Sequence, residues 1–280
     1  LRSAAGILPL AQSLLSQGLA VARLTRRGVV GTFCVTKKRG RLRLVFDCRQ
    51  VHLQCHPPGR SHLSTPGALR QLRADRGSGG ASRPFGGRVV SVDLDNSFYL
   101  FRWPEISELF ALDAEFRAED LGVDTAFDEN GVAVDVGRDD LVYVCLATLP
   151  MGWNWSMYFC HGVCTDISLM ALRRANLVVG DPLRQLVCDG RVPARLAARA
   201  PLAAPCVDNF QFLCWDRADS ELALAALCCV LDEYGLSYRI ESAGAPRFDV
   251  VGLDMDLERL RVGNLPKRWW RVRAAIFATL

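Results

Sequence analysis

The chain has 280 residues, half of them hydrophobic, and a formal net charge of +4 at neutral pH. That is enough apolar material for a substantial core, in one large domain or two subdomains. No run is long and apolar enough to span a bilayer, so we expect no membrane partner. Because the chain begins with Leu1 and stops in a helix-like run, we expect it to be a fragment of something longer.

The net charge hides a strong asymmetry along the chain. Up to Arg88 there are 16 Lys and Arg against two acidic residues, whereas Asp93 to Asp140 holds three Arg against 14 acidic residues. A basic first third suggests a polyanionic partner such as nucleic acid. An ordinary solvated basic face is the alternative.

Eleven cysteines are scattered without a CxxC pair. Buried, reduced thiols in an intracellular protein, cytoplasmic or nuclear, fit this pattern best. The densest group of ligand-type residues has a spacing that matches no tetrahedral zinc pattern. It consists of Cys48, His52, Cys55, His56 and His62.

The first third predicts a helix followed by a basic hairpin. Ile7–Leu19 has the polar spacing of an amphipathic helix rather than a signal sequence. Gly28–Thr36 and Arg41–Asp47 alternate like two strands. The turn between them, Lys37–Gly40, is basic, and such a tip suits triphosphate or backbone phosphates.

A connector separates this hairpin from the next strand. Pro57–Pro66 is a predicted loop and Leu69–Leu72 a short helix. Arg76–Gly87 is rich in Gly and Ser, which is typical of a mobile linker, and we place a subdomain joint there.

The strand after the connector ends in a carboxylate. Val89, Val90 and Val92 form an apolar β-branched run that favours a buried strand, and Asp93 follows it. A carboxylate at that position is costly unless a cation or a donor meets it. Asp95 would point to the same face if the strand continued, and the alternative is a strand whose Asp caps the next helix.

The middle of the chain predicts two strands, an insertion and a helix. Glu108–Leu112 and Leu141–Leu149 are predicted strands, and the acidic segment between them is expected to be a surface loop. A Gly-Trp turn then leads into a helix over Met157–Leu172. Glycine lets the backbone approach a ligand closely, and a helix start offers free N–H donors. Gly180–Ala204 is expected to be irregular.

A second strand-end carboxylate follows in Ala204–Trp215. This segment reads as a β-hairpin with Asp208 and Asn209 in its turn. Asp93 and Asp208 could therefore meet across a sheet. Mg²⁺ is commonly held by one or two carboxylates plus substrate phosphates, and two such ions can stabilise both oxygens of a phosphoryl transfer.

The last part of the chain predicts a helix, two strands and a final helix. Asp219–Tyr234 is helical, with an Asp or Ser cap and Gly235 at its end. Leu236–Glu241 and Phe248–Leu253 are strands around a Gly-Ala-Pro turn. Pro266–Leu280 starts a basic helix.

Taken in order, five segments resemble a reverse transcriptase (RNA-directed DNA polymerase) of the retroviral and retrotransposon type. The resemblance covers roughly Val29 to Asp256. The five segments are Phe33–Arg49 (the fingers hairpin), Ser91–Tyr99 (the first catalytic Asp), Leu149–Trp153 (Leu-Pro-x-Gly-Trp), Cys206–Asn209 (Tyr-x-Asp-Asp) and Val250–Leu253 (near the primer grip).

The resemblance implies an α+β, palm-and-fingers polymerase fold, with an antiparallel palm sheet backed by helices and a truncated thumb. Residues 1–87 would be fingers-like, 88–256 the palm with fingers insertions, and 257–280 the start of the thumb.

The resemblance also implies roles for individual residues. Asp93 and Asp208, with the Leu94 carbonyl, would hold two Mg²⁺ or Mn²⁺ ions, and Asn209 completes the catalytic group. The dNTP would be bound by Lys37, Arg43, Phe98, Met151, Gly152 and Trp153. The template and primer would be contacted by Lys38, Arg39, Arg41, Arg49 and Cys206. Among these, the Phe98 ring would exclude a 2′-hydroxyl.

The implied partners are an RNA or DNA template with its primer, a dNTP, and further polyprotein domains such as ribonuclease H, integrase or recombinase.

Three departures from the family pattern leave alternatives open. Asn209 stands where a second Asp is usual, and Cys206 replaces a Tyr. The region before Gly252 has no Lys where the family often places one that can protonate pyrophosphate. Arg239 is nearby, but it is a poor proton donor because it stays charged. The chain is then either an active polymerase, with activity reduced, or a catalytically silent nucleic-acid-binding remnant of the same fold. A palm-type RNA polymerase is a third reading, which Phe98 disfavours.

Overall fold

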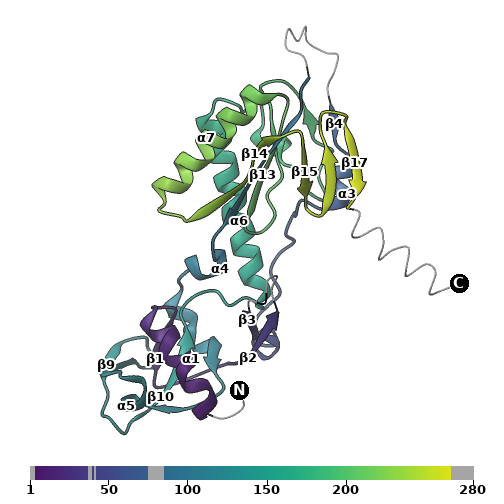
Figure 1. The fold of residues 1–280 in the computed structure, drawn as a ribbon. Helices are drawn as coiled ribbons and strands as arrows, with labels where there is room; N and C mark the ends of the chain where they lie inside the picture. Colours follow the sequence, from purple (N-terminus) through teal and green to yellow (C-terminus); the bar gives the residue numbers. More distant parts are fainter. Residues whose placement is uncertain (1–3, 37–39, 41, 75–84, 266–280) are drawn as a thin grey trace, which may run out of the picture. The chain divides into compact units, whose positions relative to one another are not determined.

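The computed structural model describes residues 4–36, 40, 42–74 and 85–265. The chain divides into two compact units, each described here by itself. Unit 1 comprises Leu1–Gly59 and Asn96–Cys160, and unit 2 comprises Arg60–Asp95 and His161–Leu280. The architecture is mixed α and β, as expected from the sequence (Figure 1). No helix in the described part of the chain is long and apolar enough to cross a membrane.

Unit 1 is built on a mixed sheet with the order β3-β2-β6-β10-β1-β8-β9, in which β7 also pairs with β10. Its strands are β1 (Ala20–Arg23), β2 (Val29–Thr36), β3 (Leu42–Asp47), β6 (Ala111–Leu112), β7 (Phe116–Arg117), β8 (Thr125–Phe127), β9 (Ala133–Asp135) and β10 (Leu141–Leu146). Its helices are α1 (Ala4–Ser16), α2 (Arg49–His52), α4 (Ser97–Leu100), the 3₁₀ helix η2 (Pro104–Phe110) and α5 (Ala118–Leu121). Helix α6 (Asn154–Arg174) begins in unit 1 and ends in unit 2.

Unit 2 is built on an antiparallel sheet with the order β12-β13-β5-β14. Its strands are β5 (Arg88–Leu94), β12 (Leu202–Ala203), β13 (Asn209–Cys214) and β14 (Tyr238–Ala245). Helix α7 (Arg217–Glu233) packs against β5, β13 and β14, as can be followed in Figure 1. The Asp216 side chain caps α7 by accepting a hydrogen bond from the Asp219 N–H at 3.0 Å.

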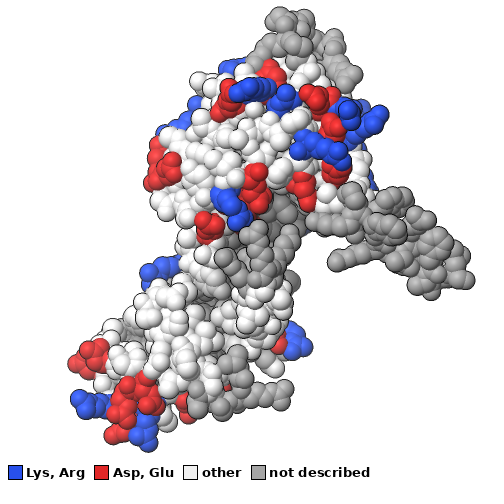
Figure 2. Space-filling model, viewed as in Figure 1, with Lys and Arg blue, Asp and Glu red and all other residues white. Residues whose placement is uncertain are grey.

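Smaller elements complete unit 2. A second antiparallel sheet contains β15 (Arg247–Val250), β16 (Leu253–Asp256) and β17 (Arg261–Asn264). The others are α3 (Pro66–Arg70), η3 (Pro182–Gln185) and the parallel pair β4 (Arg73–Ala74) and β11 (Arg195–Leu196). On the face drawn in Figure 2, acidic and basic side chains of unit 2 are interspersed, so no single charge covers that face.

The basic hairpin, the strand that ends near Asp93 and the helix after Trp215 are confirmed. Four other expectations were wrong. The segment Glu108–Leu112 is mostly 3₁₀ helix, and only its last two residues form β6. The acidic insertion is not a loop, because it forms β7, α5, β8 and β9. Gly180–Ala204 contains η3, β11 and β12. Leu253 begins a new strand after a turn at Val251 and Gly252, and both of these residues have positive φ.

Candidate active site

Two neighbouring strands of unit 2 bring Asp93 and Asp208 together. The valines of β5 are fully buried, so this strand lies in the middle of the sheet, and Asp93 is its last residue but one. Strand β13 begins at Asn209, which lies directly opposite Asp93 in the antiparallel register. Asp208 precedes it, and its carbonyl accepts a hydrogen bond from the Leu94 N–H at 3.0 Å.

The hairpin turn lies one residue earlier than the sequence predicted. Cys206 and Asn209 exchange backbone hydrogen bonds of 2.9 and 3.1 Å, so Val207 and Asp208 form the two-residue loop. Two-residue hairpin loops favour turns with positive φ, and Val207 has φ of 58°. A β-branched residue is strained in that region, so the turn that holds Asp208 stores conformational energy.

The other neighbour of β5 supplies a cation. Arg239 of β14 lies opposite Asp93, and its guanidinium donates to the Asp93 carboxylate with an Nη2–Oδ2 distance of 2.7 Å. The ladder is irregular between Ile240 and Ser242, which leaves Glu241 between two paired positions. The Glu241 carboxylate lies 3.6 Å from the same guanidinium. Arg239 therefore contacts two carboxylates at once.

Burial and several neighbouring charges shift the pKa of Asp93. Burial raises the pKa of Asp93, the Asp208 carboxylate raises it further, and Glu241 adds a smaller effect. The Arg239 guanidinium opposes these effects without cancelling them. Asp93 and Asp208 are thus close enough to repel each other, and a divalent cation between them would relieve that repulsion.

Asn209 is held by polar neighbours on the same face of the sheet. Its amide oxygen accepts from the Ser91 hydroxyl at 3.3 Å, and its amide nitrogen donates to Glu241 at 3.4 Å. Ser91 is fully buried and also lies 3.3 Å from Glu241. The amide at the position of the expected second Asp thus lies next to a carboxylate from β14.

The oxygen ligands here fit a hard divalent cation whose coordination is completed by substrate. Within the described ranges, no group of three or more His, Cys, Asp or Glu side chains is arranged to hold a metal. Mg²⁺ does not need one, because it usually keeps waters and takes one or two carboxylates plus phosphates. Asp93 and Asp208 are two carboxylates that could serve in this way. Burial and Asp208 raise the pKa of the Cys206 thiol, which disfavours a thiolate ligand.

Gly152 lies where two segments of unit 1 approach closely. Its φ is +131°, which L side chains rarely adopt, and a Cβ there would overlap the Phe46 carbonyl oxygen. The Phe46 N–H donates to the Met151 carbonyl at 3.1 Å, which fixes the turn against β3. Glycine at this position is therefore required by the contact between this turn and the basic hairpin.

Trp153 is a core residue of unit 1. The residue is 6% exposed, and its ring packs edge-on against Phe110 with centroids 5.0 Å apart. Among the residues that the structure describes, the buried indole N–H has no hydrogen-bond partner. Met151, in contrast, is only half-buried.

Phe98 and Arg43 also lie in unit 1. Phe98 is half-buried on the short helix α4, next to Tyr99. Burial raises the pKa of the Tyr99 hydroxyl and the Arg43 charge partly offsets that rise, so Arg43 lies near α4. A cation and an aromatic helix thus occur together in this unit.

Of the remaining basic candidates, Arg49 lies within the described residues. Arg49 forms an exposed ion pair with Asp47, with its Nη2 2.6 Å from the carboxylate. Four residues lie outside the described ranges: Lys37, Lys38, Arg39 and Arg41. The nucleotide candidates that are described belong to unit 1, whereas Asp93, Asp208, Asn209 and Cys206 belong to unit 2.

Two residues of this edge were missed as site residues. Arg239 was expected only to be a poor proton donor, and Glu241 was assigned no role from the sequence. A usable signal was their spacing, because residues two apart on a strand share a face. What could not be read from the sequence was the pairing of β14 with β5, which places this face beside Asp93.

Comparison with solved structures gives the fold. One foamy viral protease-reverse transcriptase dRH in complex with ds DNA matches with a TM-score of 0.59 and 15% identity, over 97% of this chain and 36% of that one. A foamy viral protease-reverse transcriptase in complex with dsDNA matches with a TM-score of 0.57 and 15% identity, over 97% of this chain and 44% of that one. The chain has a reverse-transcriptase-like fold.

This chain thus spans less than half the length of either polymerase-containing protein. No protein-family profile and no curated protein matches the sequence. The likeness is therefore one of fold, and it supports the sequence resemblance without extending it to activity.

Proposed function

We propose that the chain is the polymerase part of a retroelement reverse transcriptase, an RNA-directed DNA polymerase that transfers a nucleotide from a dNTP to a primer 3′-hydroxyl. The observation that carries this proposal is the convergence of Asp93 and Asp208 at adjacent strands of an antiparallel sheet. Such a carboxylate pair suits a divalent cation bound together with phosphates.

The two units fit the parts of a polymerase of this type. The sheet of β5, β12, β13 and β14, backed by α7, corresponds to the palm. Unit 1, with the β2–β3 hairpin, would supply the fingers, and its residues 96–160 would be the fingers insertions within the palm range 88–256. Residues 257–280 would begin the thumb.

Each residue at this edge of the sheet has a proposed role. Asp93 and Asp208, with the Leu94 carbonyl, would hold two Mg²⁺ or Mn²⁺ ions. Bound there, the ions would supply Lewis-acid stabilisation of the attacking and leaving oxygens. Asn209 would accept or donate a hydrogen bond without adding charge.

The residues of unit 1 would hold the nucleotide. Lys37 and Arg43 would bind the triphosphate, while Met151, Gly152 and the packed Trp153 would shape the pocket. Phe98 would leave no room for a 2′-hydroxyl, and would thereby select deoxynucleotides.

A template with its primer is the proposed macromolecular partner. Both compared reverse transcriptases are described in complex with DNA, and the first third of this chain is strongly basic. Lys38, Arg39, Arg41 and Arg49 would contact the backbone phosphates, and Cys206 would lie at the primer. Further polyprotein domains would accompany this part.

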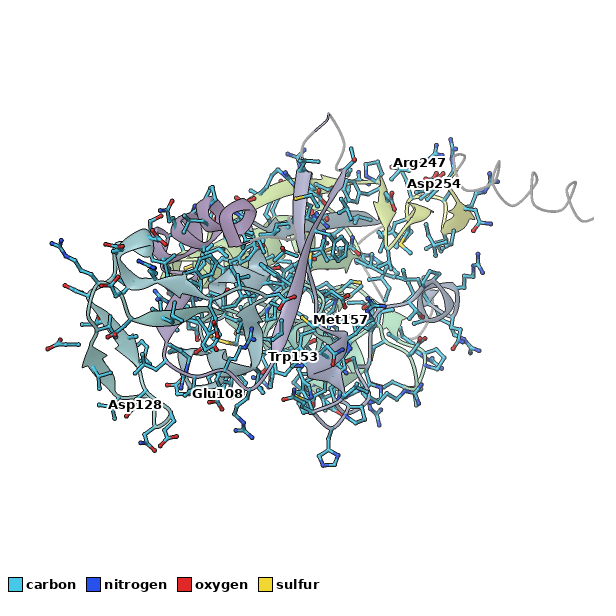
Figure 3. The ribbon with its side chains drawn as sticks, turned by 90° about the horizontal axis from the view of Figure 1, so that it is seen from below. Glu108, Asp128, Trp153, Met157, Arg247 and Asp254 are labelled. Carbon is cyan, nitrogen blue, oxygen red and sulfur yellow. The ribbon has the colours of Figure 1, made fainter. Side chains whose placement is uncertain are left out.

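Primer extension by the full-length protein tests the proposal. We expect Mg²⁺- or Mn²⁺-dependent extension of a DNA primer on an RNA template, lost in Asp93→Asn and in Asp208→Asn. A matched control is Asp254→Asn, a carboxylate on the β15–β16 hairpin of the same unit (Figure 3). Extension undiminished by Asp208→Asn would refute the site assignment.

A silent nucleic-acid-binding remnant is the second candidate, favoured by two observations. Asn209 removes one carboxylate, and Arg239 already forms an ion pair with Asp93. The remnant predicts template-primer binding without extension, and recovery of extension in Asn209→Asp.

A further inference from the structure

Arg239 and Glu241 form an arrangement that the proposed reaction does not use. The Arg239 guanidinium lies 2.7 Å from Asp93 and 3.6 Å from Glu241. A divalent cation bound to Asp93 would need the same carboxylate oxygens. The guanidinium and the cation are therefore competitors for one ligand.

We propose that Arg239 is a positioning residue that holds Asp93 in the metal-free protein and passes to Glu241 when a divalent cation binds. The inference rests on the proposed metal-binding role of Asp93. It assigns Arg239 to metal occupancy rather than to proton transfer.

The ion pair is weak enough to open. The Arg239 side chain is 62% exposed and the Asp93 side chain 26% exposed, so water competes for the guanidinium. Exposed ion pairs contribute little free energy, and a long Arg side chain pays entropy to stay in one geometry. Two like charges would also repel if the guanidinium stayed beside a bound cation.

The second position for the guanidinium already exists. Glu241 lies in the irregular part of the β14 ladder, and it is held by Ser91 and Asn209 at 3.3 and 3.4 Å. Because the guanidinium already lies 3.6 Å from the Glu241 carboxylate, only a short movement separates its two positions.

Direct Mn²⁺ binding to the full-length protein, measured by electron paramagnetic resonance of the free ion, tests the exchange without relying on activity. We expect Arg239→Gln to bind Mn²⁺ roughly three- to tenfold more tightly than the unaltered protein, because both the competition and the repulsion are removed. The control is Arg247→Gln, which removes an Arg 61% exposed that pairs with Asp254 on another hairpin (Figure 3). It should leave Mn²⁺ affinity unchanged.

Glu241→Gln tests the transfer itself. It should weaken Mn²⁺ binding, and the loss should be larger when Arg239 is present than in the Arg239→Gln background. Equal losses in both backgrounds would overturn the transfer to Glu241. Thermal unfolding of both variants should match that of the unaltered protein, so a structural defect would be recognised.

The remaining outcomes distinguish a failure of this inference from a failure of the proposed function. If Asp93→Asn abolishes Mn²⁺ binding while Arg239→Gln leaves it unchanged, the competition is wrong and the metal site stands. If no variant binds Mn²⁺, both the metal site and the competition are overturned.

Discussion

Gly152→Ala should disrupt the contact between the Gly-Trp turn and the basic hairpin. Two costs add at this position. A φ of +131° is nearly restricted to glycine and costs about 1–3 kcal/mol for another residue. The new methyl would overlap the Phe46 carbonyl oxygen and lie 3.2 Å from its carbon, and relieving such an overlap costs about 1–3 kcal/mol more. The expected total is about 2–6 kcal/mol.

Amide hydrogen exchange of the Phe46 N–H measures this loss locally, because that group donates to Met151 across the contact. A local probe is preferable, since a chain with two units need not unfold in one step. A loss of about 2 kcal/mol or more should speed exchange by about thirtyfold or more.

Gly131→Ala is the matched control within unit 1. Gly131 also has a positive φ of 77°, but no atom of the described residues, its own chain neighbours aside, lies within 4 Å of the new methyl. It should cost only about 1–2 kcal/mol, from backbone strain alone. If Gly152→Ala cost no more than Gly131→Ala, the close approach to Phe46 would not be what demands glycine.

Three further predictions concern the proposed polymerase site. Phe98→Val should admit ribonucleotides in primer extension, and unchanged sugar selectivity would remove the steric argument. Val207→Asn should stabilise unit 2 by about 1 kcal/mol in urea unfolding, because Asn tolerates the φ of 58° better than Val does, and a loss of stability would contradict the strain. Asp93→Asn should raise stability at neutral pH without metal, because the folded-state pKa of Asp93 is raised and ionisation therefore opposes folding. That advantage should shrink as the pH falls through the raised pKa towards the ordinary Asp value, and an advantage independent of pH would refute the assignment.

The segments with strong local patterns were predictable. The β2–β3 hairpin and helix α7 follow from alternation and capping, which are properties of neighbouring residues. The buried strand before Asp93 follows from its valines. In these cases the residues that decide the structure lie within the segment itself.

Most of the predictions that failed concern segments whose structure depends on contacts between distant parts of the chain. The acidic insertion lacks a strong local pattern, yet it contributes β8, which pairs with β1 from the start of the chain. Strand β1 was overlooked for the same reason, since only four residues form it. The turn was predicted one residue too late in the chain, because Val207 at positive φ contradicts the local preference of Val.

At the candidate site too, some residues were predictable from local sequence and others required the pairing of distant strands. The sequence predicted both carboxylates, since each ends an apolar run. The role of Arg239 required the register of β14 on β5, which places the guanidinium opposite Asp93. Glu241 also required the irregularity in that ladder, and its spacing of two residues from Arg239 was its local signal.

Localised cleavage by Fe²⁺ tests the central claim, that Asp93 and Asp208 hold one metal centre. Fe²⁺ bound in place of Mg²⁺ generates radicals that cut the backbone nearby. Cuts should occur around residues 93 and 208 together, and both should vanish in Asp93→Asn as well as in Asp208→Asn. Cutting around residue 93 that persists in Asp208→Asn would show that the two carboxylates do not share a cation.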